Sequence, residues 1–75
     1  MRWQELITSN PEVMHGATCF EGTRIPVSVV LDNLAAGVTA AELFANYPSL
    51  PADAIPAALA YAADLARERV IPISA

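Results

Sequence analysis

The stretch that decides the fold is "PVSVVLDNLAAGVTAAELFANYP", residues 26–48. Its first half has apolar residues at the spacing of one helical face, namely Val27, Val30, Leu31, Leu34 and Ala35. Pro26 suits the first helical position, where a missing N–H group costs nothing, and Gly37 suits the end, where a left-handed backbone is needed. The pattern therefore predicts a first helix over residues 26–36.

The second half of the stretch begins with a capping box, in which the side chains of Thr39 and Glu42 each accept a backbone N–H group of the other residue. Pro48 then limits the second helix to about two turns. Its inward-facing residues are predicted to be Leu43, Phe44 and Tyr47. Because only residues 37–38 separate the first helix from this cap, the two helices are predicted to form a helix-turn-helix.

A third helix is predicted from about residue 54 to residue 69, with Asp53 as its N-cap. This start places Pro56 at the third helical position, where N–H groups lack partners in any case. Its apolar rows consist of Ile55, Leu59, Ala62 and Ala66, with Ala58, Tyr61 and Leu65 beside them. The alanine-rich surface serves either helix packing within the chain or a subunit interface. After this helix Pro72 forbids further helix, and "VIPIS", residues 70–74, is predicted to be a short extended tail.

The part of the chain before the first helix is predicted to contain β structure. "LIT", residues 6–8, has the composition of a short strand. "TCF" at 18–20 and "TRI" at 23–25 flank Gly22, which can take the positive φ of a tight turn, and this arrangement predicts a small hairpin. The predicted fold is therefore mainly α: a three-helix helix-turn-helix, preceded by a short β-hairpin and followed by an extended tail.

Composition indicates a single domain, residues 1–75, that needs a partner. Hydrophobic residues make up 55% of the 75 residues and charged residues 16%, which is more apolar material than so small a core buries. The single cysteine, Cys19, excludes an internal disulfide, and no cluster of ligands indicates a metal or a cofactor. Association with a second copy or with another protein is the remaining way to bury the excess, so we expect a homodimer or a complex.

The sequence indicates neither a membrane protein nor an enzyme. No apolar run reaches the length of a membrane span or a signal peptide, so we expect a cytoplasmic protein without membrane contact. His15 and Cys19 are the residues closest to a nucleophilic pair, but no third group accompanies them to orient the base. We therefore expect no catalytic activity, and we predict that Cys19 is a small buried hydrophobic residue.

The charge balance disfavours tight binding to nucleic acids. The formal net charge is −4, the chain has no lysine, and its arginines are Arg2, Arg24, Arg67 and Arg69. Strong nucleic-acid binding draws most of its affinity from a basic face, which these residues are too few to build in a monomer. The first turns of the third helix also lack the Arg, Asn, Gln or Lys side chains that contact base edges. We therefore expect any DNA binding to be weak and strongly dependent on salt.

Six residues are the candidates for contact with a partner, whether protein or DNA: Arg24, Arg67, Arg69, Val70, Ile71 and Ile73. Arg24 either pairs with a nearby carboxylate or backbone carbonyl in the hairpin, or it contacts a DNA phosphate or an acidic partner surface. Arg67 and Arg69 either complement the dipole at the end of the third helix, or they form a partner-binding strip with the apolar tail.

Three segments carry a resemblance to a known family: "NPEVMHG" at 10–16, "GTRIPVSVVLDNLAAG" at 22–37, and "YPSLPADAIPAALAYAADLARERV" at 47–70. The chain resembles the family called domain of unknown function 433, small bacterial proteins regarded as VapB-like antitoxins. The resemblance implies a homeodomain-like helix-turn-helix preceded by a short β element. It also implies a dimeric antitoxin that binds and inhibits a co-encoded PIN-type ribonuclease toxin and represses its own operon. A regulator that acts mainly by binding DNA is the alternative.

Overall fold

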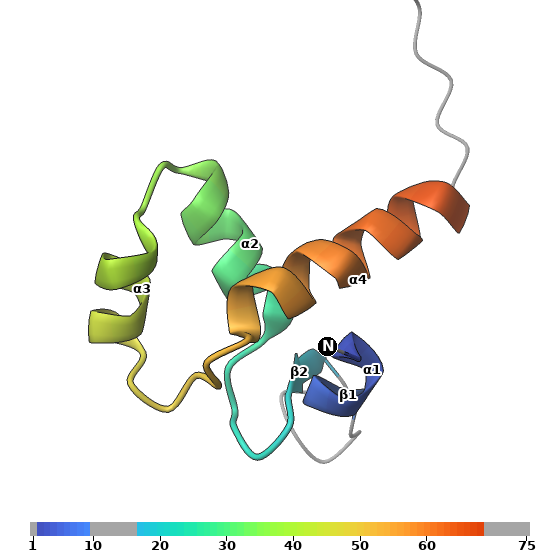
Figure 1. The fold of residues 1–75 in the computed structure, drawn as a ribbon, viewed down its shortest axis with the longest axis horizontal. Coiled ribbons are helices and arrows are strands. Elements are labelled where there is room, and N and C mark those ends of the chain that lie inside the picture. The colour runs from blue at the N-terminus through green and yellow to red at the C-terminus, as the bar shows by residue number, and fades with distance from the viewer. Residues whose placement is uncertain (1, 10–16, 69–75) are drawn as a thin grey trace, which may run out of the picture.

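The computed structural model describes residues 2–9 and 17–68 of the chain. The elements follow the order α1 (Trp3–Leu6), β1 (Ile7–Ser9), β2 (Thr18–Phe20), α2 (Val27–Ala35), α3 (Ala40–Asn46) and α4 (Ala54–Glu68). Figure 1 shows α2 and α3 on one side of α4, and the small sheet with α1 on the other. The prediction of a mainly helical fold with a short antiparallel β element is confirmed. No helix among the described residues is both long enough and apolar enough to cross a membrane.

The sheet consists of two strands whose pairing was not predicted from the sequence. β1 and β2 run antiparallel with Ile7 opposite Phe20, Thr8 opposite Cys19 and Ser9 opposite Thr18. The strand predicted at 6–8 is therefore present with a shift of one residue. Of the hairpin predicted between 18–20 and 23–25, only the turn, one hydrogen bond and an isolated bridge are present, and the ladder of β2 is formed with residues 7–9.

A tight turn does follow β2, centred on Gly22. The Thr23 N–H group donates to the Phe20 carbonyl at 3.0 Å, and Gly22 has a φ of 77°, which a residue with a side chain adopts only at a cost. Beyond the turn, the Phe20 N–H group donates to the Ile25 carbonyl at 3.1 Å, and one isolated bridge joins Cys19 to Pro26. Pro26 has no N–H group to extend a ladder, and α2 begins at the next residue, so no third strand forms.

The two helices within residues 26–48, α2 and α3, lie close to their predicted bounds. Pro26 lies one residue outside α2, in an extended conformation with a ψ of 145°. At the other end the N–H groups of Gly37 and Val38 donate to the Leu34 and Asn33 carbonyls at 3.1 and 3.0 Å, which is the Schellman arrangement. Gly37 has a φ of 86°, as this ending requires.

The capping box predicted for α3 is confirmed. The Glu42 N–H group donates to the Thr39 hydroxyl at 3.2 Å, and the Thr39 N–H group donates to the Glu42 carboxylate at 3.4 Å. The start of α4 is also as predicted, because Ala54 is its first residue and Pro56 its third. The first carbonyl of that helix belongs to Asp53, which accepts from the Ala57 N–H group at 3.0 Å.

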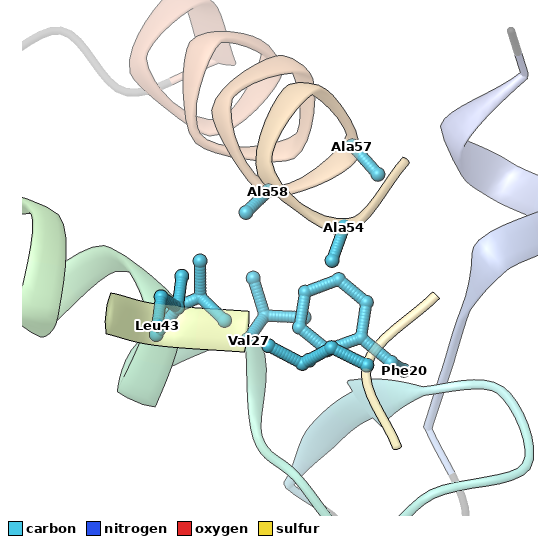
Figure 2. Close-up of a cluster of buried hydrophobic side chains, with 8 residues drawn as sticks. Phe20, Val27, Leu43, Ala54, Ala57 and Ala58 are labelled. Carbon is cyan, nitrogen blue, oxygen red and sulfur yellow. The ribbon is translucent and has the colours of Figure 1, made fainter. Parts of the chain in front are cut away.

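The core lies where α2, α3 and β2 meet the first half of α4 (Figure 2). Its buried members are Phe20, Val27, Val30, Leu43, Leu50, Ala54, Ala57 and Ala58. The buried face of α4 therefore consists of alanines, whose small side chains let the helix approach Phe20 and the valines closely. Of the larger residues predicted on the apolar rows of α4, Ile55 and Tyr61 pack against this core, whereas Leu59 is 52% exposed and Leu65 43%.

The short helix α1 was not predicted, and a contact with α4 holds it in place. The Trp3 indole N–H group donates to an Asp64 carboxylate oxygen at 3.1 Å. The Trp3 ring also meets the Tyr61 ring edge to face, with 5.5 Å between centroids and 73° between planes. The Tyr61 hydroxyl in turn lies 3.4 Å from that of Thr18 in β2. These contacts tie α1, β2 and the second half of α4 together.

We expect Trp3→Phe to lower the free energy of unfolding by about 1 kcal/mol, because it keeps an aromatic ring against Tyr61 but removes the donor to Asp64. Urea unfolding followed by circular dichroism measures this loss. In an Asp64→Ala background the same change should cost much less, since the acceptor is already gone. Equal costs in the two backgrounds would show that the hydrogen bond is not the source.

Candidate partner-binding surfaces

Arg24 lies on a segment whose backbone is fixed on both sides. The Thr23 hydroxyl donates to the Phe20 carbonyl at 2.8 Å and accepts from the Ile25 N–H group at 3.1 Å. These bonds add to the turn at Gly22 and the bond between Phe20 and Ile25. The Arg24 side chain is exposed, so a rigid backbone presents a flexible guanidinium to solvent.

Arg24 differs from the other described arginines in having no partner within the described residues. Arg2 pairs with Glu5 at 3.7 Å, and Arg67 pairs with Asp64, in both cases at a spacing of three residues along a helix. Within residues 2–9 and 17–68, Arg24 makes neither a hydrogen bond nor an ion pair. The structure therefore offers no support, in this part of the chain, for a clip between Arg24 and a neighbouring carboxylate or carbonyl.

A pocket of about 340 Å³ opens beside Arg24. Its lining residues are Thr8, Ala17, Cys19, Glu21, Gly22, Thr23 and Arg24. Thr8 and Cys19 are opposite each other in the ladder, so their side chains share one face of the sheet. Cys19 is only 2% exposed, which confirms the prediction that it is buried. Glu21 and Arg24 both line the pocket, yet they form no ion pair with each other.

A second candidate surface is formed by the exposed leucines of α4. Leu59 and Leu65 are the large apolar side chains most exposed in the described part of the chain. Leu65 also lines a pocket of about 320 Å³ between α4 and the start of α2, together with Ala17, Thr18, Pro26, Val27, Ser28, Leu31 and Tyr61. We call the surface around these two exposed leucines the distal α4 face and define it by Leu59 and Leu65. Periodicity marked both leucines as apolar, but it did not show that they are exposed.

The predicted partner-binding strip is only partly described. Arg67 is exposed in the last turn of α4, and its guanidinium is already paired with the Asp64 carboxylate. Arg69, Val70, Ile71 and Ile73 lie outside the described residues. In Figure 1 the turn between β2 and α2 lies on the opposite side of the molecule from the far end of α4. The structure therefore does not bring Arg24 and Arg67 together on one face.

Among residues 2–9 and 17–68, no three His, Cys, Asp or Glu side chains gather in a group that could hold a metal ion. The first turn of α4 presents no side chain suited to base edges, since Ala54, Ala57 and Ala58 are buried and Pro56 is exposed. Among the described residues, the surface offers a guanidinium without a partner in that part of the chain, beside a pocket, and two exposed leucines on α4.

Comparison with known proteins identifies relatives over most of the chain. The family model described as "Protein of unknown function (DUF433)" matches residues 7–62. The uncharacterized protein y4eO of Sinorhizobium fredii is 37% identical over 59 residues, which cover 79% of this chain and 27% of that protein. The crystal structure of a DUF433 member from Anabaena variabilis superposes with a TM-score of 0.75 at 34% identity, over 87% of this chain and 64% of that one. The chain thus spans about a quarter of the length of the first relative and under two thirds of the second.

Proposed function

The chain belongs to the DUF433 family, and from that membership we propose that it is the antitoxin of a type II toxin–antitoxin pair, which binds and inhibits a PIN-type ribonuclease encoded beside it. The resemblance noted in the sequence supplies the toxin class, a homodimeric state, and a role in repressing the operon. The proposal includes a homeodomain-like arrangement of α2, α3 and α4, with α2 and α3 joined by the turn at Gly37.

The observation that carries the proposal is the distal α4 face. Leu59 and Leu65 are both exposed on α4, and Leu65 borders an apolar pocket. Burying such side chains against another protein removes apolar surface from water and contributes roughly 25 cal/mol per Å². A nucleic-acid backbone offers no comparable apolar surface. The distal α4 face therefore favours a protein partner.

A regulator that acts mainly by binding DNA is the second candidate, and it would use the proposed helix-turn-helix arrangement of α2 and α3. The charges disfavour it. Of the arginines in the described part of the chain, Arg2 and Arg67 each pair with a carboxylate on their own helix, and the whole chain has a net charge of −4. Phosphate binding needs several free cations on one surface.

Co-expression with the neighbouring nuclease tests the proposal. We expect the two proteins to co-purify, and we expect growth arrest and RNA cleavage by the nuclease to disappear when this chain is present. Co-expression with an unrelated PIN-type nuclease is the control for specificity. Absence of a complex, together with a footprint of the chain alone on its operator at physiological salt, would establish the second candidate instead.

We expect Leu59→Ser combined with Leu65→Ser to weaken nuclease binding by about 100-fold, because truncating central apolar contacts commonly costs 2 kcal/mol or more. Isothermal titration measures the change. The matched control is Ala41→Ser with Ala45→Ser, which places hydroxyls on two exposed positions of α3. If both double variants bind like the wild type, the distal α4 face is not the interface.

A further inference from the structure

We propose that the pocket beside Arg24 is a carboxylate-binding site, which takes an aspartate or glutamate side chain of the protein partner. This inference rests on the proposed function and adds a second contact to it, separate from the distal α4 face. The Arg24 guanidinium binds the carboxylate, and the Thr8 hydroxyl lines the same pocket.

The pocket is preorganised at its backbone. Bonds at 2.8 to 3.1 Å link Phe20, Thr23 and Ile25, and they hold the turn that carries Arg24. On its other side the pocket is bounded by the ladder pair Thr8 and Cys19. A partner that binds here therefore orders little beyond the Arg24 side chain, which lowers the entropic cost of association.

The guanidinium of Arg24 is available to such a partner. Arg2 and Arg67 are held by carboxylates on their own helices, whereas Arg24 has no partner within residues 2–9 and 17–68. A planar guanidinium binds a carboxylate through two parallel hydrogen bonds, and these are stronger than bonds between neutral groups. A bound protein segment covers the pocket and strengthens the pair further, because water then screens it less than on an open surface.

The negative charge of Glu21 favours a protein carboxylate over a nucleic-acid phosphate as the ligand of this pocket. Glu21 lines the same pocket as Arg24, so a strand of phosphates would bring one of its charges near a like charge. A protein segment avoids this conflict, since it can place a carboxylate at Arg24 and an N–H donor at Glu21. Two rim charges of opposite sign also fix the direction in which the segment binds.

A titration of the free protein tests the chemistry of the pocket without any partner. We expect sodium acetate, compared with sodium chloride at equal ionic strength, to produce saturable NMR shifts at the amides of Gly22, Thr23 and Arg24. Arg24→Gln should abolish them, whereas Arg2→Gln, which removes the same charge from an exposed ion pair, should leave them unchanged. The proposal is overturned if acetate gives no saturable shift, or if inorganic phosphate gives a larger one that also depends on Arg24.

Binding to the co-encoded nuclease tests the biological partner. Arg24→Gln should weaken the complex by about 30-fold or more, the usual loss when one member of a desolvated charge pair is truncated. Arg24→Lys keeps the positive charge but loses the two parallel N–H donors of the guanidinium. Its affinity for the nuclease should therefore fall between those of the wild type and Arg24→Gln. Arg2→Gln should bind within about twofold of the wild type.

The outcomes separate this inference from the proposed function. A nuclease that binds the wild type and Arg24→Gln equally well overturns the inference and leaves the antitoxin function intact. A nuclease that binds neither the wild type nor Arg24→Gln overturns the antitoxin function. The acetate titration then tests by itself whether the pocket binds a carboxylate. Thermal unfolding of each variant shows whether a loss of binding reflects the surface or the fold.

Discussion

Phe20→Ala should lower the free energy of unfolding by about 3–5 kcal/mol, a large part of the stability of so short a domain. Phe20 is 0% exposed and lies in the cluster that faces the alanines of α4 (Figure 2), so its removal leaves a cavity that the rigid β2 and α4 cannot close. Phenylalanine to alanine changes in cores cost about 3–5 kcal/mol. A domain of this length has roughly 4–11 kcal/mol in all, at 0.05–0.15 kcal/mol per residue. Circular dichroism against temperature and urea measures the loss.

Phe44→Ala is the matched control for this prediction. Phe44 is half-buried at the edge of the same core, on α3, so the same truncation removes less buried surface and leaves no closed cavity. We expect a loss well below that of Phe20→Ala, with a cooperative transition still visible at physiological temperature. Equal losses for the two variants would contradict the assignment of Phe20 to the centre of the core.

Much of the fold is predictable because its signals are local. The capping box at Thr39, the ending at Gly37 and the position of Pro56 each depend on hydrogen bonds within one or two turns of the chain. Such signals are contained in a few consecutive residues. For this reason α2, α3 and α4 begin within one residue of their predicted positions.

The parts that could not be predicted depend on contacts between distant residues. α1 is held by Trp3 and Asp64, which are 61 residues apart. The strand at 18–20 forms its ladder with residues 7–9, and no signal within either short strand indicates this pairing. Alanines on every face of α4 give no periodicity that marks the buried side, so the exposure of Leu59 was hidden.

The candidate site was predictable in the same uneven way. Arg24 was a candidate in the sequence because no turn or helix end requires an arginine at this position. In the structure it has no partner within the described residues. The pairs Arg2 with Glu5 and Asp64 with Arg67 could have been predicted from their spacing of three residues on helices. The pocket could not, because it combines residues from β1, β2 and the turn after it.

Leu43→Ala should lower the free energy of unfolding by about 2–5 kcal/mol. Leu43 is 0% exposed, and it is the only residue of α3 that is buried. It lies near Val27 of α2 in the core (Figure 2). Its truncation therefore removes the buried side chain that holds α3 and its contact with α2. Urea unfolding of the purified variant, compared with the wild type at the same temperature, measures the change.

Leu59→Ala makes the same chemical change on a side chain that is 52% exposed, and we expect it to cost less than about 1 kcal/mol, because alanine is also the better helix former. Binding to the co-encoded nuclease should show the reverse order. Leu43→Ala should bind with wild-type affinity at temperatures where it remains folded, since its side chain reaches no surface, whereas Leu59→Ala should bind more weakly while remaining stable. If Leu59→Ala loses as much stability as Leu43→Ala, the distal α4 face belongs to the core of the chain, and the argument for a protein partner there fails.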